Sequence, residues 1–118
     1  MVDKDDYRSM IDRNETVTIA SSETDSTAID CGGMVFTGFI LPATFTGTAV
    51  TFKVSDDNST FYALKGSDGN DISYTVAQGN AYAVENAVLF AGWRWIKIIS
   101  GSSEGAERTI KVSLRGMQ

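Results

Sequence analysis

The sequence predicts an all-β protein, a single β-sandwich or jelly roll of about eight short antiparallel strands with a flexible N-terminal arm. Apolar and polar residues alternate over short segments, and turn-forming residues separate these segments roughly every 8 to 12 residues. No long segment has the periodicity of a helix. With 118 residues, of which 42% are hydrophobic and 21% charged, the chain has the size and composition of one domain with its own core.

The clearest expected strand covers residues 49–55 (AVTFKVS), because Val50, Phe52 and Val54 point to one side of an extended chain. The first expected strand covers residues 15–20 (ETVTIA). The other expected strands cover residues 34–41, 60–65, 72–77, 81–85, 93–100 and 107–114. The segments between them are rich in Gly, Ser, Asp and Asn, which favour turns.

Two segments do not alternate. In NAVLFAG we expect one short helical turn that tucks Val88, Leu89 and Phe90 under the sandwich. The N-terminal residues have no stable apolar stripe, so we expect an arm over residues 1–14 and a sandwich domain over residues 15–118. Two interpretations of the arm stay open: it is mobile, or it becomes ordered against a neighbouring molecule.

Composition disfavours several classes of function. A net charge of −5 repels phosphate, so we expect no nucleic acid as a partner. The chain has no histidine and one cysteine, which removes the common general bases and leaves no plausible zinc site. We therefore expect no enzyme activity and no cofactor. No apolar run approaches the roughly 20 residues of a membrane helix, and we expect synthesis and folding in the cytoplasm.

The stretch GWRWIKII holds the first candidate site. In an extended strand over residues 93–100, Ile96 and Ile98 face the core, with Arg94 at its rim. The opposite face then carries Trp93, Trp95, Lys97 and Ile99. This face is covered by ordinary sheet packing, contacts a subunit or partner, or stacks a ligand, and the sequence leaves all three open. The candidate interface residues are these four together with Tyr7, Met10 and Ile11 of the arm.

Acidic residues gather in the segment SDDNSTFYALKGSDGND. Asp57, Asp68 and Asp71 either contribute to a calcium site or serve turns, and the spacing does not match an EF-hand. SDDNSTFY also looks like a degenerate Asp-box, which supports a hairpin and nothing catalytic. We expect Glu104 and Glu107 to be solvated charges and Cys31 to be a small turn or core residue.

The order of these segments resembles small structural proteins of tailed bacteriophages, of the head decoration or cement type. The resemblance covers about residues 16–114, and it is carried by Ala28-Ile29-Asp30 leading into Gly32-Gly33, Leu41-Pro42, residues 52–57 and residues 89–101. It implies a β-sandwich that binds the outside of a capsid, commonly as a dimer or trimer. The implied partner is the major capsid protein, and the implied location is the exterior of the virion. The resemblance names no contact residue.

Three alternatives differ in class. A tail, neck or fibre component with a small carbohydrate-binding module would present an exposed aromatic pair in a concave groove. A glycosidase would need two carboxylates about 5 to 10 Å apart in a cleft. A plain interaction domain of a bacterial protein would be distinguished from a virion protein by whether its gene lies among capsid and portal genes.

Overall fold

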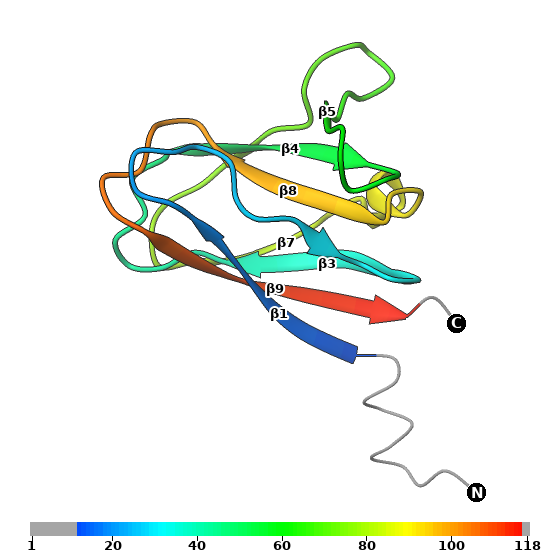
Figure 1. Cartoon of the computed structure of the whole chain (residues 1–118), viewed down its shortest axis with the longest axis horizontal. Helices are drawn as coiled ribbons and strands as arrows, with labels where there is room; N and C mark the ends of the chain where they lie inside the picture. The colour runs from blue at the N-terminus through cyan, green and yellow to red at the C-terminus, as the bar shows by residue number, and fades with distance from the viewer. Residues whose placement is uncertain (1–11, 117–118) are drawn as a thin grey trace, which may run out of the picture.

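The structure, a computed structural model, describes residues 12–116 and is a β-sandwich (Figure 1). This confirms the predicted fold class. The strands are β1 (Asp12–Ile19), β2 (Ile29–Asp30), β3 (Met34–Ile40), β4 (Ala49–Ser55), β5 (Tyr62–Ala63), β6 (Tyr74–Thr75), β7 (Ala81–Ala83), β8 (Trp95–Ser100) and β9 (Arg108–Gly116). One 3-10 helix, η1 (Ala87–Phe90), joins β7 to β8. Among the described residues, no helix is long and apolar enough to span a membrane.

The strands form two antiparallel sheets that pack face to face. The four-stranded sheet has the order β1-β9-β3-β7, and the other sheet has the order β2-β8-β4-β5 with β6 also paired to β4. The first and last strands pair with each other, from Asp12 opposite Arg115 to Ile19 opposite Arg108. The sandwich therefore depends on contacts between segments far apart in the sequence.

Several observed strands differ from the expected ones in their bounds, and one was not expected. β1 begins at Asp12 and not at residue 15, because β9 extends far enough to pair with residues 12–14. The two-residue strand β2 was not predicted, and the segments expected at 60–65 and 72–77 shorten to β5 and β6. The rest of the predicted arm, with Tyr7, Met10 and Ile11, lies outside the described residues.

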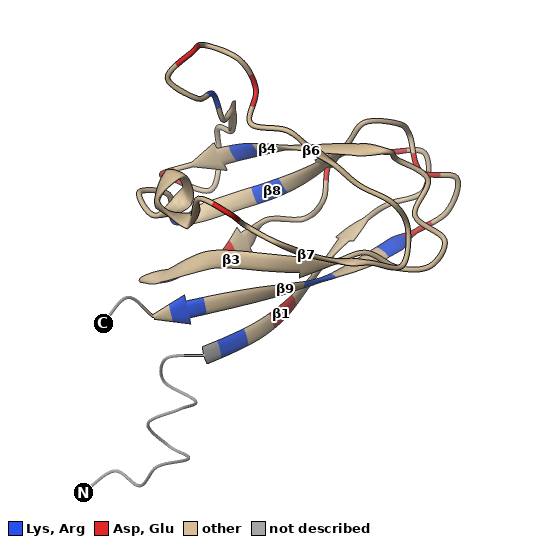
Figure 2. Cartoon of the chain, turned by 180° about the vertical axis from the view of Figure 1, so that it is seen from behind, with Lys and Arg blue, Asp and Glu red and all other residues tan. Residues whose placement is uncertain are grey.

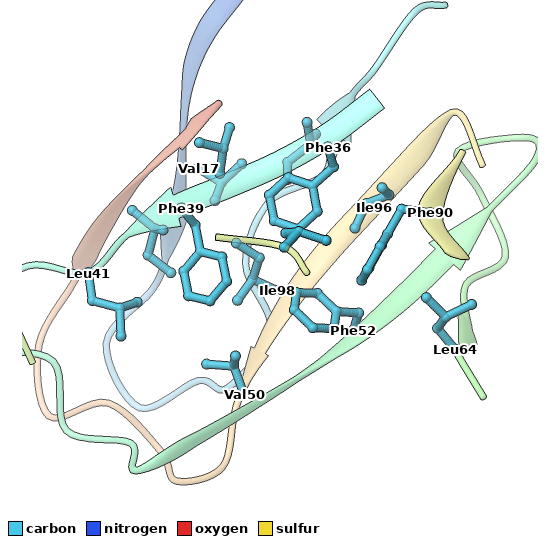
Figure 3. Packing of buried hydrophobic residues seen from close by; sticks show 14 of the residues in the cluster. Val17, Phe36, Phe39, Leu41, Val50, Phe52, Leu64, Phe90, Ile96 and Ile98 are labelled. Carbon is cyan, nitrogen blue, oxygen red and sulfur yellow. The ribbon is translucent and has the colours of Figure 1, made fainter. Parts of the chain in front are cut away.

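A cluster of phenylalanines fills the space between the sheets (Figure 3). The ring of Phe52 on β4 lies 5.9 Å from that of Phe36 on β3 and 5.0 Å from that of Phe90, centroid to centroid. Such edge-to-face contacts stabilise a core beyond the burial of apolar area alone. The helical turn predicted in NAVLFAG is confirmed, but it buries only Phe90, while Val88 is 71% and Leu89 41% exposed. One turn of 3-10 helix has about three residues, so a single side chain points inward.

A β-bulge in β3 lets two phenylalanines three residues apart enter the same core. Simple alternation would place Phe36 and Phe39 on opposite faces of the sheet. The pairing with β9 shifts between Phe36 and Gly38, and both rings are buried. A Cβ atom at Gly38 would lie 3.1 Å from the backbone oxygen of Tyr82, so the close approach of β7 favours glycine here.

Replacing Phe52 by alanine should lower the free energy of unfolding by about 3–5 kcal/mol, because it opens a cavity at the centre of the aromatic cluster. Denaturant unfolding measures this change. Tyr62→Ala is the control, since Tyr62 is 61% exposed and its loss should cost no more than about 0.5 kcal/mol. Equal effects of the two substitutions would contradict the described core.

Candidate functional site

Strand β8 has the two faces that alternation predicts. Ile96 and Ile98 have no exposed surface and pack in the core. Trp95, Lys97 and Ile99 are half-buried and lie on the outer face of the five-stranded sheet. These three predicted site residues therefore share a surface.

Trp93 lies outside strand β8, contrary to the prediction of a strand over residues 93–100. β8 begins at Trp95, where the pairing with Asp30 of β2 starts. Trp93 belongs to the turn after η1, its backbone N–H donates to the carbonyl of Phe90 at 3.2 Å, and its side chain is 36% exposed. Arg94 was expected at the rim of the core, but its side chain is 57% exposed and pairs with Asp30. Trp93 and Arg94, which alternation assigned to the strand, therefore belong to the turn between η1 and β8.

Two cations lie over aromatic rings on this outer face. The guanidinium carbon of Arg94 is 4.5 Å from the centroid of a Trp95 ring, and the Nζ atom of Lys97 is 4.3 Å from the ring centroid of Phe61. Asp30 accepts a hydrogen bond from Arg94 Nε at 2.9 Å, and this bond lowers the pKa of the Asp30 carboxyl. The stacked cations cover part of the rings that a sugar or base would need.

A pair of lysines lies at the centre of the same face. Lys53 on β4 is directly opposite Lys97 on β8, an arrangement that is unfavourable for like charges. Lys53 Nζ donates a hydrogen bond to Asp25 Oδ2 at 2.8 Å, while the Nζ atom of Lys97 lies over the ring of Phe61. Figure 2 shows the basic segments of β4 and β8 side by side. We call this surface the aromatic–cationic face and define it by Trp95, Lys97, Ile99, Lys53, Phe61 and Arg94.

The outer face of the four-stranded sheet holds a hollow of about 690 Å³ that the sequence analysis missed. Its lining includes the small side chains of Thr16, Gly38, Ala81, Ala83 and Ser113. Ile40 lies at its edge and is 47% exposed. We call this surface the small-residue hollow. The outward positions of these strands, read together, would have shown few long polar side chains, but β1 and β9 are adjacent only after folding.

Glu104 is fully buried, so the expectation of a solvated charge was wrong. Its carboxylate accepts hydrogen bonds from the backbone N–H groups of Thr46 (2.8 Å) and Gly47 (3.0 Å), the Ser100 hydroxyl (2.8 Å) and Arg108 Nε (3.0 Å). Burial raises the pKa of this carboxyl, but these four donors outweigh burial and hold the pKa below its usual value of 4.5. Glu104 therefore links the segment of Thr46 and Gly47 to strands β8 and β9. Both oxygens of its carboxylate have hydrogen-bond donors from the fold itself. Glu107 is exposed.

The acidic loop residues serve the turns in which they lie. Asp57 Oδ1 accepts the backbone N–H groups of Ser59 (2.9 Å) and Thr60 (3.0 Å). Asp68 accepts the backbone N–H of Asn70 at 3.0 Å, and Asp71 pairs with a lysine. Within residues 12–116, no group of three or more His, Cys, Asp or Glu side chains is placed to hold a metal ion. The structure thus favours the turn interpretation over calcium.

Cys31 is a buried side chain of the core cluster, as expected. It is 1% exposed, and burial raises the pKa of its thiol to about 11. A thiol with this pKa is almost entirely protonated at neutral pH and is a poor nucleophile.

Comparison with known proteins gives a structural neighbour. The chain is similar to the crystal structure of the SPBc2 prophage-derived protein YomS, with a TM-score of 0.55 and 17% sequence identity. The match covers 88% of this chain and 94% of the other, so the two share the sandwich over nearly their whole length. No family model matches the sequence, and no curated protein matches it.

Replacing Glu104 by glutamine should lower the free energy of unfolding by about 2–4 kcal/mol at pH 7, because the buried charge on which Arg108 depends is lost. A carboxyl with a lowered pKa in the folded chain stabilises the fold above its usual pKa of 4.5, and this contribution disappears as the pH falls through the folded-state value. The difference between wild type and variant should therefore shrink in acid.

Denaturant unfolding from neutral to acid pH measures both effects. Glu107→Gln is the matched control, because it is the same substitution at an exposed position three residues away. A constant difference between Glu104→Gln and wild type at every pH would contradict the role given to the carboxylate.

Proposed function

We propose that this chain is a structural protein of a phage particle that attaches to the outer surface of the capsid and stabilises the shell. The observation that carries the proposal is the aromatic–cationic face, which presents partly exposed rings and cations from paired strands. The similarity in fold to a prophage-derived protein supports a phage setting. The proposed partner is the major capsid protein.

The charges of this face suit an acidic shell surface. It has three cations, Arg94, Lys53 and Lys97, against the two carboxylates of Asp25 and Asp30. The chain as a whole has a net charge of −5. This face would therefore approach carboxylates of a capsid protein, while the acidic loops elsewhere on the surface repel other copies.

A shell-binding protein does not require a deep pocket. One sheet face gives a modest contact, but symmetry repeats it many times over the shell, and linked contacts add up through effective concentration. A protein that binds the assembled shell and not its separate subunits shifts the equilibrium away from disassembly. Copies that also contact one another, as a dimer or trimer, would strengthen this effect.

The same face argues against the alternative of a carbohydrate-binding module. Sugar binding needs free ring faces in a concave groove, whereas the rings of Trp95 and Phe61 each carry a stacked cation. Trp93, which was expected to extend the aromatic row, lies outside strand β8. We therefore propose the capsid in preference to the tail.

The experiment is to locate the chain in assembled particles. Particles are produced in cells that carry the gene with an epitope tag, purified on a density gradient and separated into heads and tails. We expect the chain in the head fraction, with its tag accessible to antibody on intact heads. Heads that lack the chain should release their DNA at a lower temperature. Recovery in the tail fraction, or only among free proteins, would contradict the proposal.

Lys97→Glu should raise the Kd for the head by about tenfold, which corresponds to roughly 1.4 kcal/mol of lost binding, and should therefore lower the number of copies per head. The substitution reverses a charge at the centre of the aromatic–cationic face but places an opposite charge beside Lys53, so the fold should keep its stability. Quantitative mass spectrometry of purified heads counts the copies.

Lys65→Glu is the control, since Lys65 is an exposed lysine in the loop between β5 and β6. Its copy number should stay close to that of wild type. Equal loss for both variants would show that the overall charge, and not this face, decides binding.

A further inference from the structure

We propose that the small-residue hollow binds the same surface of a second copy, so that two copies form a two-fold symmetric dimer through their four-stranded sheets. The inference goes beyond the proposed function, because it concerns a contact between copies in solution and not the contact with a shell. The aromatic–cationic face lies on the other sheet and stays free in such a dimer.

The hollow exists because the outward positions of this sheet are small. The outer face of an antiparallel sheet is usually covered by long polar side chains. Here β7 contributes Ala81 and Ala83, β3 contributes Gly38, and the neighbouring strands contribute Ser113 and Thr16. Within residues 12–116, these small side chains leave a space that the side chains of a second copy can fill.

Ile40 supplies a side chain of the right kind. It lies at the edge of the hollow on β3, and nearly half of its surface is exposed, which is unfavourable for a large aliphatic side chain in water. In a two-fold contact each copy presents the same patch to the other. Ile40 of each copy can then enter the hollow of its partner, and one arrangement buries both.

The charges on this face allow two acidic chains to approach. The outward positions of β1 from Asn14 onward, of β3, of β7 and of β9 as far as Ser113 carry no carboxylate, and the charged residue among them is Lys111. Glu15 lies at the rim of the hollow on the edge strand β1 and pairs with Arg13 of its own chain at 2.9 Å, so it adds no unpaired carboxylate to the contact. The contact therefore avoids the acidic loops that give the chain its net charge of −5.

The area of the face sets the strength of the contact. The strands β1, β9, β3 and β7 have eight, nine, seven and three residues, so at about 3.3 Å per residue and about 4.8 Å between strands they cover about 430 Å² per copy. If the two surfaces are treated as flat, the two copies together would bury about 900 Å². This is slightly below the roughly 1,000 Å² of total buried area at which specific interfaces begin. We therefore expect a reversible dimer whose population rises with protein concentration.

Sedimentation equilibrium of the full chain over a range of concentrations tests the proposal. We expect the wild-type mass to rise from that of a monomer to that of a dimer. Ile40→Glu removes the inserted side chain and Ala83→Phe fills the hollow, so both variants should stay monomeric. Because both positions are exposed, their thermal unfolding at low concentration should match that of wild type. The control Tyr62→Glu, an equally drastic change on the other sheet, should still dimerise.

A cysteine at the hollow shows which surface is covered. In Ser113→Cys the new thiol lines the hollow, whereas Cys31 is 1% exposed and its raised pKa makes it slow to react. The rate of maleimide labelling at position 113 should fall as the concentration of the protein rises.

Three results would overturn the proposal. The first is a wild-type chain that stays monomeric at every concentration at which it is soluble. The second is a dimer that survives both Ile40→Glu and Ala83→Phe, which would place the contact elsewhere. The third is a thiol at position 113 that is shielded equally at all concentrations, which would mean that another part of the same chain occupies the hollow.

Discussion

The contact between Phe36 and Phe52 across the two sheets is the interaction on which the rest of the structure depends. Each ring belongs to the middle of its sheet, and Phe90 closes the cluster from η1. Because this single core holds both sheets together, each sheet has one face inward and one face outward. The two outward faces are then free to differ, and both proposed contacts follow from that division.

Glu104 has a comparable role at one end of the sandwich. It is a buried charge that accepts four hydrogen bonds, and it connects the segment around Thr46 with Ser100 and Arg108. A carboxylate of this kind resembles a catalytic group in its burial, but its hydrogen bonds are all to the fold itself. Its role is therefore structural: it holds the end of β8, at Ser100, and the start of β9, at Arg108, against the segment around Thr46.

The sequence predicts the fold class and most of the core, because the alternation over residues 50–54 and 95–100 survives folding. It does not predict the bulge before Gly38, which places Phe36 and Phe39 on one face, since bulges depend on the partner strand. The buried Glu104 was missed because a glycine-rich neighbourhood suggests solvent. The small-residue hollow was missed because it combines four strands whose order in the sheet is not their order in the chain.

The most direct test of two separate outward faces is differential lysine labelling, with acetylation of each lysine measured by mass spectrometry in the free chain and on particles. Our account predicts that Lys53 and Lys97 become protected on the particle, that Lys111 is already protected in the concentrated free chain, and that Lys65 reacts equally in both states. Equal reactivity of Lys53 and Lys97 in the free and particle-bound chain would contradict the account.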